Sequence, residues 1–131
     1  MPVLDPYNEQ VRSLFAKPVH AGEVQPDYTR IVRAHAAVSA SGSRVELAAG
    51  LTDGRLAAVR FRVFGCPHLI ALTEATCDLL EGQGIDSLRR PDVREIARDL
   101  DVPVEKTGLV LLLEDTLATL EAELREPDVE D

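Results

Sequence analysis

One cysteine and one histidine stand two residues apart in the middle of the chain, at Cys66 and His68. A thiolate and an imidazole both bind zinc and iron, so this pair is a candidate metal site. A Cys-x-His pair is far weaker than a complete zinc spacing, because a structural zinc ion takes four ligands. The alternatives are that Cys66 is a small buried apolar residue and that His68 is a surface residue or a helix cap.

The same pair could in principle form a nucleophile and a base. Such a dyad needs the imidazole to reach the sulfur, and no acidic side chain is evident that would orient the ring. The sequence therefore predicts that the protein is not an enzyme.

The second cysteine and the other histidines are weaker candidates. Cys77 lies seven residues after Ile70, which is the spacing of a helix face turned to the core. The helix predicted between Cys66 and Cys77 argues against a disulfide, so both are predicted to be free thiols. His35 falls in a predicted strand, and His20 falls in the loop before it.

The elements that must position these residues begin with a helix and continue with a sheet. Asp5-Pro6 is typical of a helix start, and Pro18 ends that helix. Residues 17–27 are a predicted loop. Three strands follow, with turns at 39–43 and at the Asp53-Gly54 pair: residues 28–40, 44–49 and 56–63.

Helices occupy the rest of the chain. Gly65 ends the last strand and Cys66-Pro67 begins a helix that Gly82 terminates, so Cys66 is predicted at a helix N-terminus, where a thiolate is favoured. Asp86 and Asp92 are caps for two short helices. A leucine stripe at helical spacing predicts the final helix: Leu109, Leu113, Leu117, Leu120 and Leu124. Strands segregated from helices indicate an α+β fold, a three-stranded antiparallel sheet with helices packed on one face.

Length and charge limit the function classes. The 131 residues suit one domain, 1–131, with 127–131 as a frayed acidic tail. Residues 1–70 carry eight Lys and Arg against six Asp and Glu, whereas residues 71–131 carry six against seventeen. This acidic half argues against nucleic acid as the ligand. No stretch is apolar enough for a membrane span and the start lacks a signal peptide, so a cytoplasmic protein is expected.

Several motifs in order carry a resemblance to a known family. The most specific is the strand that ends in Phe64-Gly65-Cys66. Others are Pro18 with Gly22, the Asp53-Gly54 turn, the Gly82 that ends a helix, and the Leu112 to Asp115 segment. Together they resemble the iron–sulfur cluster assembly scaffolds of the IscU and NifU N-terminal type, over nearly the whole length. The resemblance implies a scaffold function and an α+β fold.

The family's ligand positions are mostly altered in this chain. The resemblance implies three cysteines and an aspartate at one end of the fold. Ser41 and Ser43 occupy the positions of the first cysteine and the aspartate, Cys66 retains the second cysteine, and the third lies in Lys106-Thr107-Gly108, which has neither His nor Cys. The family's chaperone-recognition loop is also altered, at 102–106. Serine hydroxyls are poor ligands for iron or zinc, and a [2Fe–2S] cluster normally takes four thiolates.

Two functions follow as hypotheses. The first is a scaffold-like protein with weak or altered metal binding through Cys66 and His68. Its candidate cargoes are an iron–sulfur cluster, iron or zinc. Two copies in a dimer would supply two of each ligand. The second is a metal-free interaction or regulatory module built on the scaffold fold. Both predict protein partners of the sulfur-delivery or cluster-transfer type, with no nucleic acid and no membrane.

Overall fold

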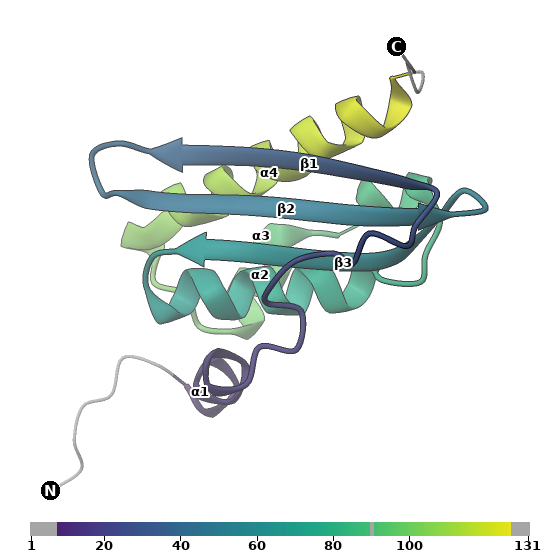
Figure 1. Cartoon of the computed structure of the whole chain (residues 1–131). Helices are drawn as coiled ribbons and strands as arrows, with labels where there is room; N and C mark the ends of the chain where they lie inside the picture. Colours follow the sequence, from purple (N-terminus) through teal and green to yellow (C-terminus); the bar gives the residue numbers. More distant parts are fainter. Residues whose placement is uncertain (1–7, 90, 127–131) are drawn as a thin grey trace, which may run out of the picture.

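The computed structural model describes residues 8–89 and 91–126 (Figure 1). The proposed acidic tail at 127–131 lies outside these residues. The elements follow the predicted order of helix, three strands and helices: α1 (Glu9–Ala16), β1 (Arg30–Val38), β2 (Ser43–Thr52), β3 (Arg55–Phe64), α2 (Pro67–Leu80), the 3₁₀ helix η1 (Ile85–Arg89), α3 (Val93–Asp99), the 3₁₀ helix η2 (Val104–Lys106) and α4 (Thr107–Arg125).

The sheet is antiparallel with strand order β1-β2-β3, as predicted. Asp53 and Gly54 both have positive φ, 52° and 73°, as the tight turn between β2 and β3 requires. In β3 the predicted core residues Val59 and Phe61 are buried, at 0% and 3% exposure. The alternation of the sequence therefore identified the inner face of the sheet.

The helices α2, α3 and α4 lie on one face of the sheet (Figure 1), which confirms the α+β prediction. Their buried leucines meet the inner face of the sheet in one core, and α4 contributes most of the predicted stripe. The predicted helix start at Asp5-Pro6 lies outside the described residues. Within them, Asn8 is the N-cap of α1, and its side chain accepts a hydrogen bond of 2.8 Å from the Val11 amide.

The outer face of the sheet is less exposed than a strand alternation alone suggests. The loop before β1 folds back over it, so that Val24 and Tyr28 pack on Ala48 and Ala58. A Cβ at Gly50 would lie 2.5 Å from the Tyr28 ring, so only glycine leaves room for this contact. A loop that contains prolines and a glycine thus covers part of the sheet face opposite the helices.

Four chain segments meet at one end of this fold. The turn between β1 and β2, the end of β3, the start of α2 and the start of α4 all lie at the left of Figure 1. The β2–β3 register pairs Arg44 with Phe64, which brings Ser43 close to the residues that follow β3. This end of the sheet is where the sequence predicted a site.

Candidate functional site

A cavity of about 700 Å³ opens at this end of the sheet. Its walls come from the β1–β2 turn, the β3–α2 junction and the start of α4, and they are mostly apolar. The residues that line it are Val38, Ser41, Gly42, Ser43, Phe64, Gly65, Cys66, Glu105, Lys106, Gly108 and Leu109. The fold therefore does bring the predicted positions Ser41, Ser43 and Cys66 together.

Cys66 is the N-cap residue of α2. Its carbonyl accepts the amides of Leu69 and Ile70, at 3.0 and 3.2 Å, and its side chain makes no capping bond. The thiol is half-buried and free, and it faces the cavity. Proline at the first helical position explains why the helix starts here, since Pro67 has no amide hydrogen to satisfy.

His68 points away from solvent, with 0% of its surface exposed. The Lys106 ammonium lies 2.8 Å from His68 Nδ1 and 3.7 Å from Cys66 Sγ. An ammonium can only donate, so Nδ1 accepts and the imidazole is the neutral tautomer with its hydrogen on Nε2. A lysine therefore lies between the two residues that the sequence suggested as metal ligands.

The remaining family positions supply no strong metal ligand. The Ser41 hydroxyl donates to the Ser43 hydroxyl at 3.0 Å and accepts the Ser43 amide at 3.3 Å, which makes a local turn. Gly108 occupies the wall where the sequence lacks a third cysteine. Within residues 8–89 and 91–126, no three His, Cys, Asp or Glu side chains group closely enough to hold a metal ion.

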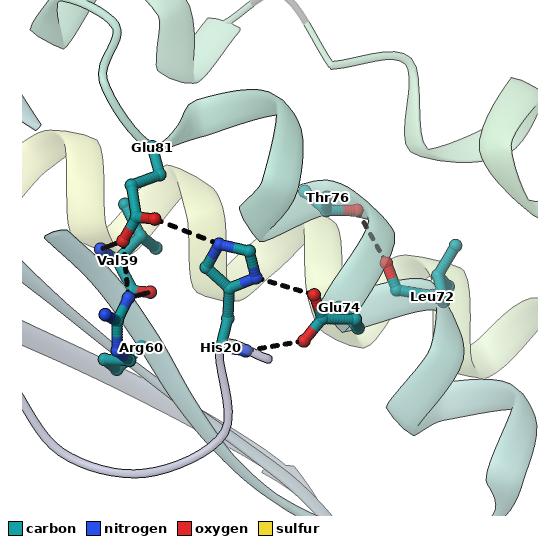
Figure 2. Close-up of polar contacts among 7 residues, drawn as sticks. All are labelled: His20, Val59, Arg60, Leu72, Glu74, Thr76 and Glu81. Atoms are coloured by element: carbon teal, nitrogen blue, oxygen red, sulfur yellow. Dashed lines mark hydrogen bonds and ion pairs between the residues drawn. The ribbon is translucent and has the colours of Figure 1, made fainter. Parts of the chain in front are cut away.

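A second polar cluster lies inside the molecule, between the loop before β1, the sheet and α2 (Figure 2). His20 and Glu74 are both buried, at 4% and 3% exposure. Glu74 accepts the His20 amide at 2.7 Å and His20 Nδ1 at 2.6 Å, while His20 Nε2 lies 3.2 Å from Glu81. The imidazole of His20 therefore lies between two carboxylates, with one at each ring nitrogen.

Glu81 links this cluster to the sheet. Its other oxygen accepts the Val59 amide at 3.0 Å and the Arg60 guanidinium. Desolvation opposes ionisation of the carboxyl, but the Val59 amide, Arg60 and His20 outweigh it and hold the pKa of Glu81 below its usual value. Basic and acidic side chains alternate along the cluster, from buried Glu74 and His20 to the partly exposed Glu81 and Arg60, so the cluster is a compensated structural network.

The two clusters are separate. Cys66 precedes the first residue of α2, whereas Glu74 and Glu81 lie on its second half and just past its end. At 1.5 Å per residue, Glu74 is roughly 12 Å farther along the helix axis than Cys66. His20 therefore lies against the second half of α2 and is not among the residues that line the cavity.

Cys77 is fully buried, as its spacing predicted. Burial, together with the nearby charges of Glu74 and Glu81, raises the pKa of its thiol far above the ordinary value. Cys77 is therefore a core residue and takes no part in the cavity.

Sequence reasoning missed Lys106 and the His20 network. Lys106 was noted only as a residue that replaced a family motif, and nothing local signals that it reaches Cys66 and His68, which are about forty positions away. A carboxylate on an apolar helix face, such as Glu74, does signal a buried partner. That signal identifies neither the partner nor its protonation state.

Together, the three-stranded sheet, the helices on one face and the cavity at the end of the sheet define an α+β domain with a candidate site at one end. The chain belongs to the NifU-like N-terminal domain family, whose model matches residues 6–122. This family consists of scaffold proteins rather than enzymes.

Curated relatives agree with this assignment. The chain is 26% identical over 111 residues to "Iron-sulfur cluster assembly protein IscU" of Plasmodium falciparum, a match that covers 85% of this chain and 68% of that protein. It is 25% identical over 113 residues to "Iron sulfur cluster assembly protein 2, mitochondrial" of Saccharomyces cerevisiae, covering 85% of this chain and 72% of that protein.

Solved structures show the same fold. A NifU-like N-terminal protein from Brucella abortus superposes with a TM-score of 0.68 at 17% identity, over 92% of this chain and 95% of that one. A putative iron–sulfur cluster assembly scaffold for the SUF system from Fervidobacterium islandicum gives a TM-score of 0.66 at 13% identity, over 88% and 96%. In the part of this chain that the structure describes, no helix has the length and apolar character to cross a bilayer.

Proposed function

We propose that this protein serves iron–sulfur cluster assembly as a metal-free interaction module, which uses the scaffold fold to dock on sulfur-delivery or cluster-transfer proteins. The observation that carries this proposal is the position of Lys106, 2.8 Å from His68 Nδ1 and 3.7 Å from Cys66 Sγ. A positive charge at this position repels a metal cation. It also engages the imidazole lone pair that a metal would need.

The rest of the donor set supports the same proposal. A cluster needs four soft donors, and the cavity contributes one thiol from each chain. The two serines that replace family ligands bond to each other, and Gly108 has no side chain. The cytoplasmic location remains a prediction from the sequence.

A second function, weak metal binding, is favoured by one observation: the half-buried thiol of Cys66 faces the cavity. Two copies meeting at this end would bring two thiols together. In this version Lys106 moves away, and Cys66 with His68 binds zinc, iron or a cluster between the copies.

Metal content separates the two functions. The protein is purified without oxygen, offered zinc or iron with sulfide, freed of excess metal and assayed for metal per chain. The interaction module predicts far less than one metal per two chains in the wild type. The second function would be established instead if the wild type and Cys77→Ala both bind near-stoichiometric metal and Cys66→Ser binds none.

Lys106→Met sharpens this measurement. Removing the ammonium takes away the repulsion and frees Nδ1 of His68, so the variant is expected to bind zinc more tightly than the wild type does. If the variant and the wild type bind zinc equally, Lys106 does not exclude the metal and the central argument fails.

Docking is tested directly with the cysteine desulfurase of the same cell as the sulfur-delivery partner. A complex of micromolar affinity or better, measured by calorimetry with metal-free protein in chelator, is expected. No binding to the desulfurase, together with no binding to a cluster-receiving protein, would reject the docking function.

A further inference from the structure

The cavity at the end of the sheet combines one cationic side chain with apolar walls. Its volume of about 700 Å³ is within the range of small-molecule sites, roughly 300–1,000 Å³. We infer that this cavity binds a small organic anion, with a carboxylate or similar oxyanion head at Lys106 and an apolar body along Phe64 and Leu109. This inference rests on the charge and shape of the cavity and is independent of the docking function.

The anionic head is placed by the donors at the inner end of the cavity. Lys106 is half-buried, and a charge in this setting acts more strongly than one in bulk water. The Ser43 hydroxyl lies 3.0 Å from the Ser41 hydroxyl, and Ser43 lines the same cavity as Lys106, so it is a second polar group for the head. Ser43 is 7% exposed, so its position is fixed.

The start of α4 adds to the same field. This helix of 19 residues begins at Thr107, directly after Lys106, and Gly108 lies on the cavity wall. Helix N-termini carry partial positive charge. A metal cation is disfavoured by this arrangement of Lys106, hydroxyls and helix end, and an oxyanion is favoured.

The apolar body of the ligand is expected to contact cavity side chains that lie outside the core. Phe64 is 77% exposed and Val38 is 37% exposed, and both line the cavity with the half-buried Leu109. Covering these side chains removes apolar surface from water, which favours binding. An inorganic ion would leave them uncovered, so the ligand has an apolar part.

Glu105 is the one carboxylate on the cavity wall. It is exposed, so solvent screens it more than it screens the half-buried Lys106. Its charge nevertheless opposes an anion, and neutralising it is expected to tighten binding. This gives the proposal a variant with a gain of affinity as well as one with a loss.

The test compares probes that share a body and differ in charge. Octanoate, octylamine, 1-octanol and inorganic phosphate are titrated into metal-free, reduced protein at pH 7 in chelator, and affinities are read from amide chemical shifts. Octanoate is expected to bind most tightly, with shifts at Gly65, Lys106 and Gly108. The inference would be overturned if phosphate, octylamine or octanol binds with an affinity equal to that of octanoate.

The variants test the head group. Lys106→Met is expected to weaken octanoate by about tenfold or more, Lys106→Arg to stay within about threefold of wild type, and Glu105→Gln to tighten it. Lys17→Met removes the chain's other lysine, which is exposed elsewhere, and is expected to change nothing. The inference would also be overturned if Lys106→Met binds octanoate as tightly as the wild type does, provided that circular dichroism shows that this variant is folded.

Discussion

The two buried histidines of this protein have opposite electrostatic surroundings. His68, at the cavity, has a lysine ammonium 2.8 Å from its ring and is neutral. His20, against the second half of α2, has carboxylates at 2.6 and 3.2 Å from its two ring nitrogens. The same residue type, buried to nearly the same extent, faces a cation in one place and two carboxylates in the other.

The difference separates structure from function in this fold. The charges around His20 compensate one another inside the molecule and tie the loop before β1 to α2 and β3 (Figure 2). The positive charge beside His68 sits on the wall of an open cavity, where it can act on a ligand or a partner. Four substitutions test this division, and they are ordered by their expected effect on the free energy of unfolding.

His20→Ala is expected to be the most destabilising. It leaves the Glu74 carboxylate buried without its partner, and breaking such a pair lowers the free energy of unfolding by roughly 3–5 kcal/mol. Urea unfolding at pH 7 measures the loss. His35→Ala is the matched control, because His35 is exposed on β1, and its effect is expected to stay within about 0.5 kcal/mol. Equal losses for both variants would show that the His20 network carries no stability.

Glu81→Gln is expected to lower the free energy of unfolding by about 1–2 kcal/mol at pH 7, since it removes a charged acceptor from Val59, Arg60 and His20. The pKa of Glu81 is depressed in the folded protein. Its contribution is therefore full above the unfolded pKa, near pH 4.3, and is lost as the pH falls through the lower folded value.

The same variant gives a pH signature. Urea midpoints for wild type and Glu81→Gln, followed from pH 7 to pH 3, are expected to converge at the acid end. A gap that stays constant over this range would mean that the charge of Glu81 is not what stabilises the fold.

Lys106→Met is expected to change the free energy of unfolding by no more than about 1 kcal/mol. Its side chain is only half-buried, and methionine keeps most of the apolar stem in place. Chemical unfolding measures this. A loss as large as that of His20→Ala would place Lys106 in the structural class and would undermine the division between the two histidines.

Cys66→Ser is expected to have the smallest effect on stability, within about 0.5 kcal/mol, while it changes thiol reactivity completely. In native wild-type protein, iodoacetamide is expected to modify Cys66 alone, because burial raises the pKa of Cys77 and shields it from reagent. Mass spectrometry counts the adducts, and denaturant is expected to expose the second thiol. Native labelling of Cys77 would contradict its place in the core.

The fold was predictable because its signals are local. Val59 and Phe61 alternate with arginines as a half-buried strand does, the leucines of α4 follow helical spacing, and Asp53-Gly54 marks the turn between β2 and β3. The start of α1 was not predictable to the residue, since Asp5 and Asn8 are both good caps. The loop that covers the outer face of the sheet was not predictable either, because Tyr28 packs there only where Gly50 leaves room, and these two residues lie in distant segments.

The candidate site was predictable in its location and not in its chemistry. The Phe64-Gly65-Cys66 segment identified the end of the sheet, and the replaced cysteines predicted that a complete ligand set is lacking. The role of His68 could not be read from its spacing to Cys66, because its ring turns inward toward Lys106. The surroundings of His20 could not be read from the sequence, because a loop residue is positioned by the side chains that it contacts.

The sequence alone thus determined the class of fold, the core faces and the position of Cys66 at a helix start, because each depends on neighbours in the chain. That the set of metal ligands is incomplete remains a prediction from the family resemblance. Only the tertiary structure decided that Lys106 lies between Cys66 and His68 and that His20 lies between Glu74 and Glu81. These pairings join residues about 40 to 60 positions apart. The packing of α2, α4 and the loop before β1 against the sheet decides whether a cation or a carboxylate lies beside each imidazole.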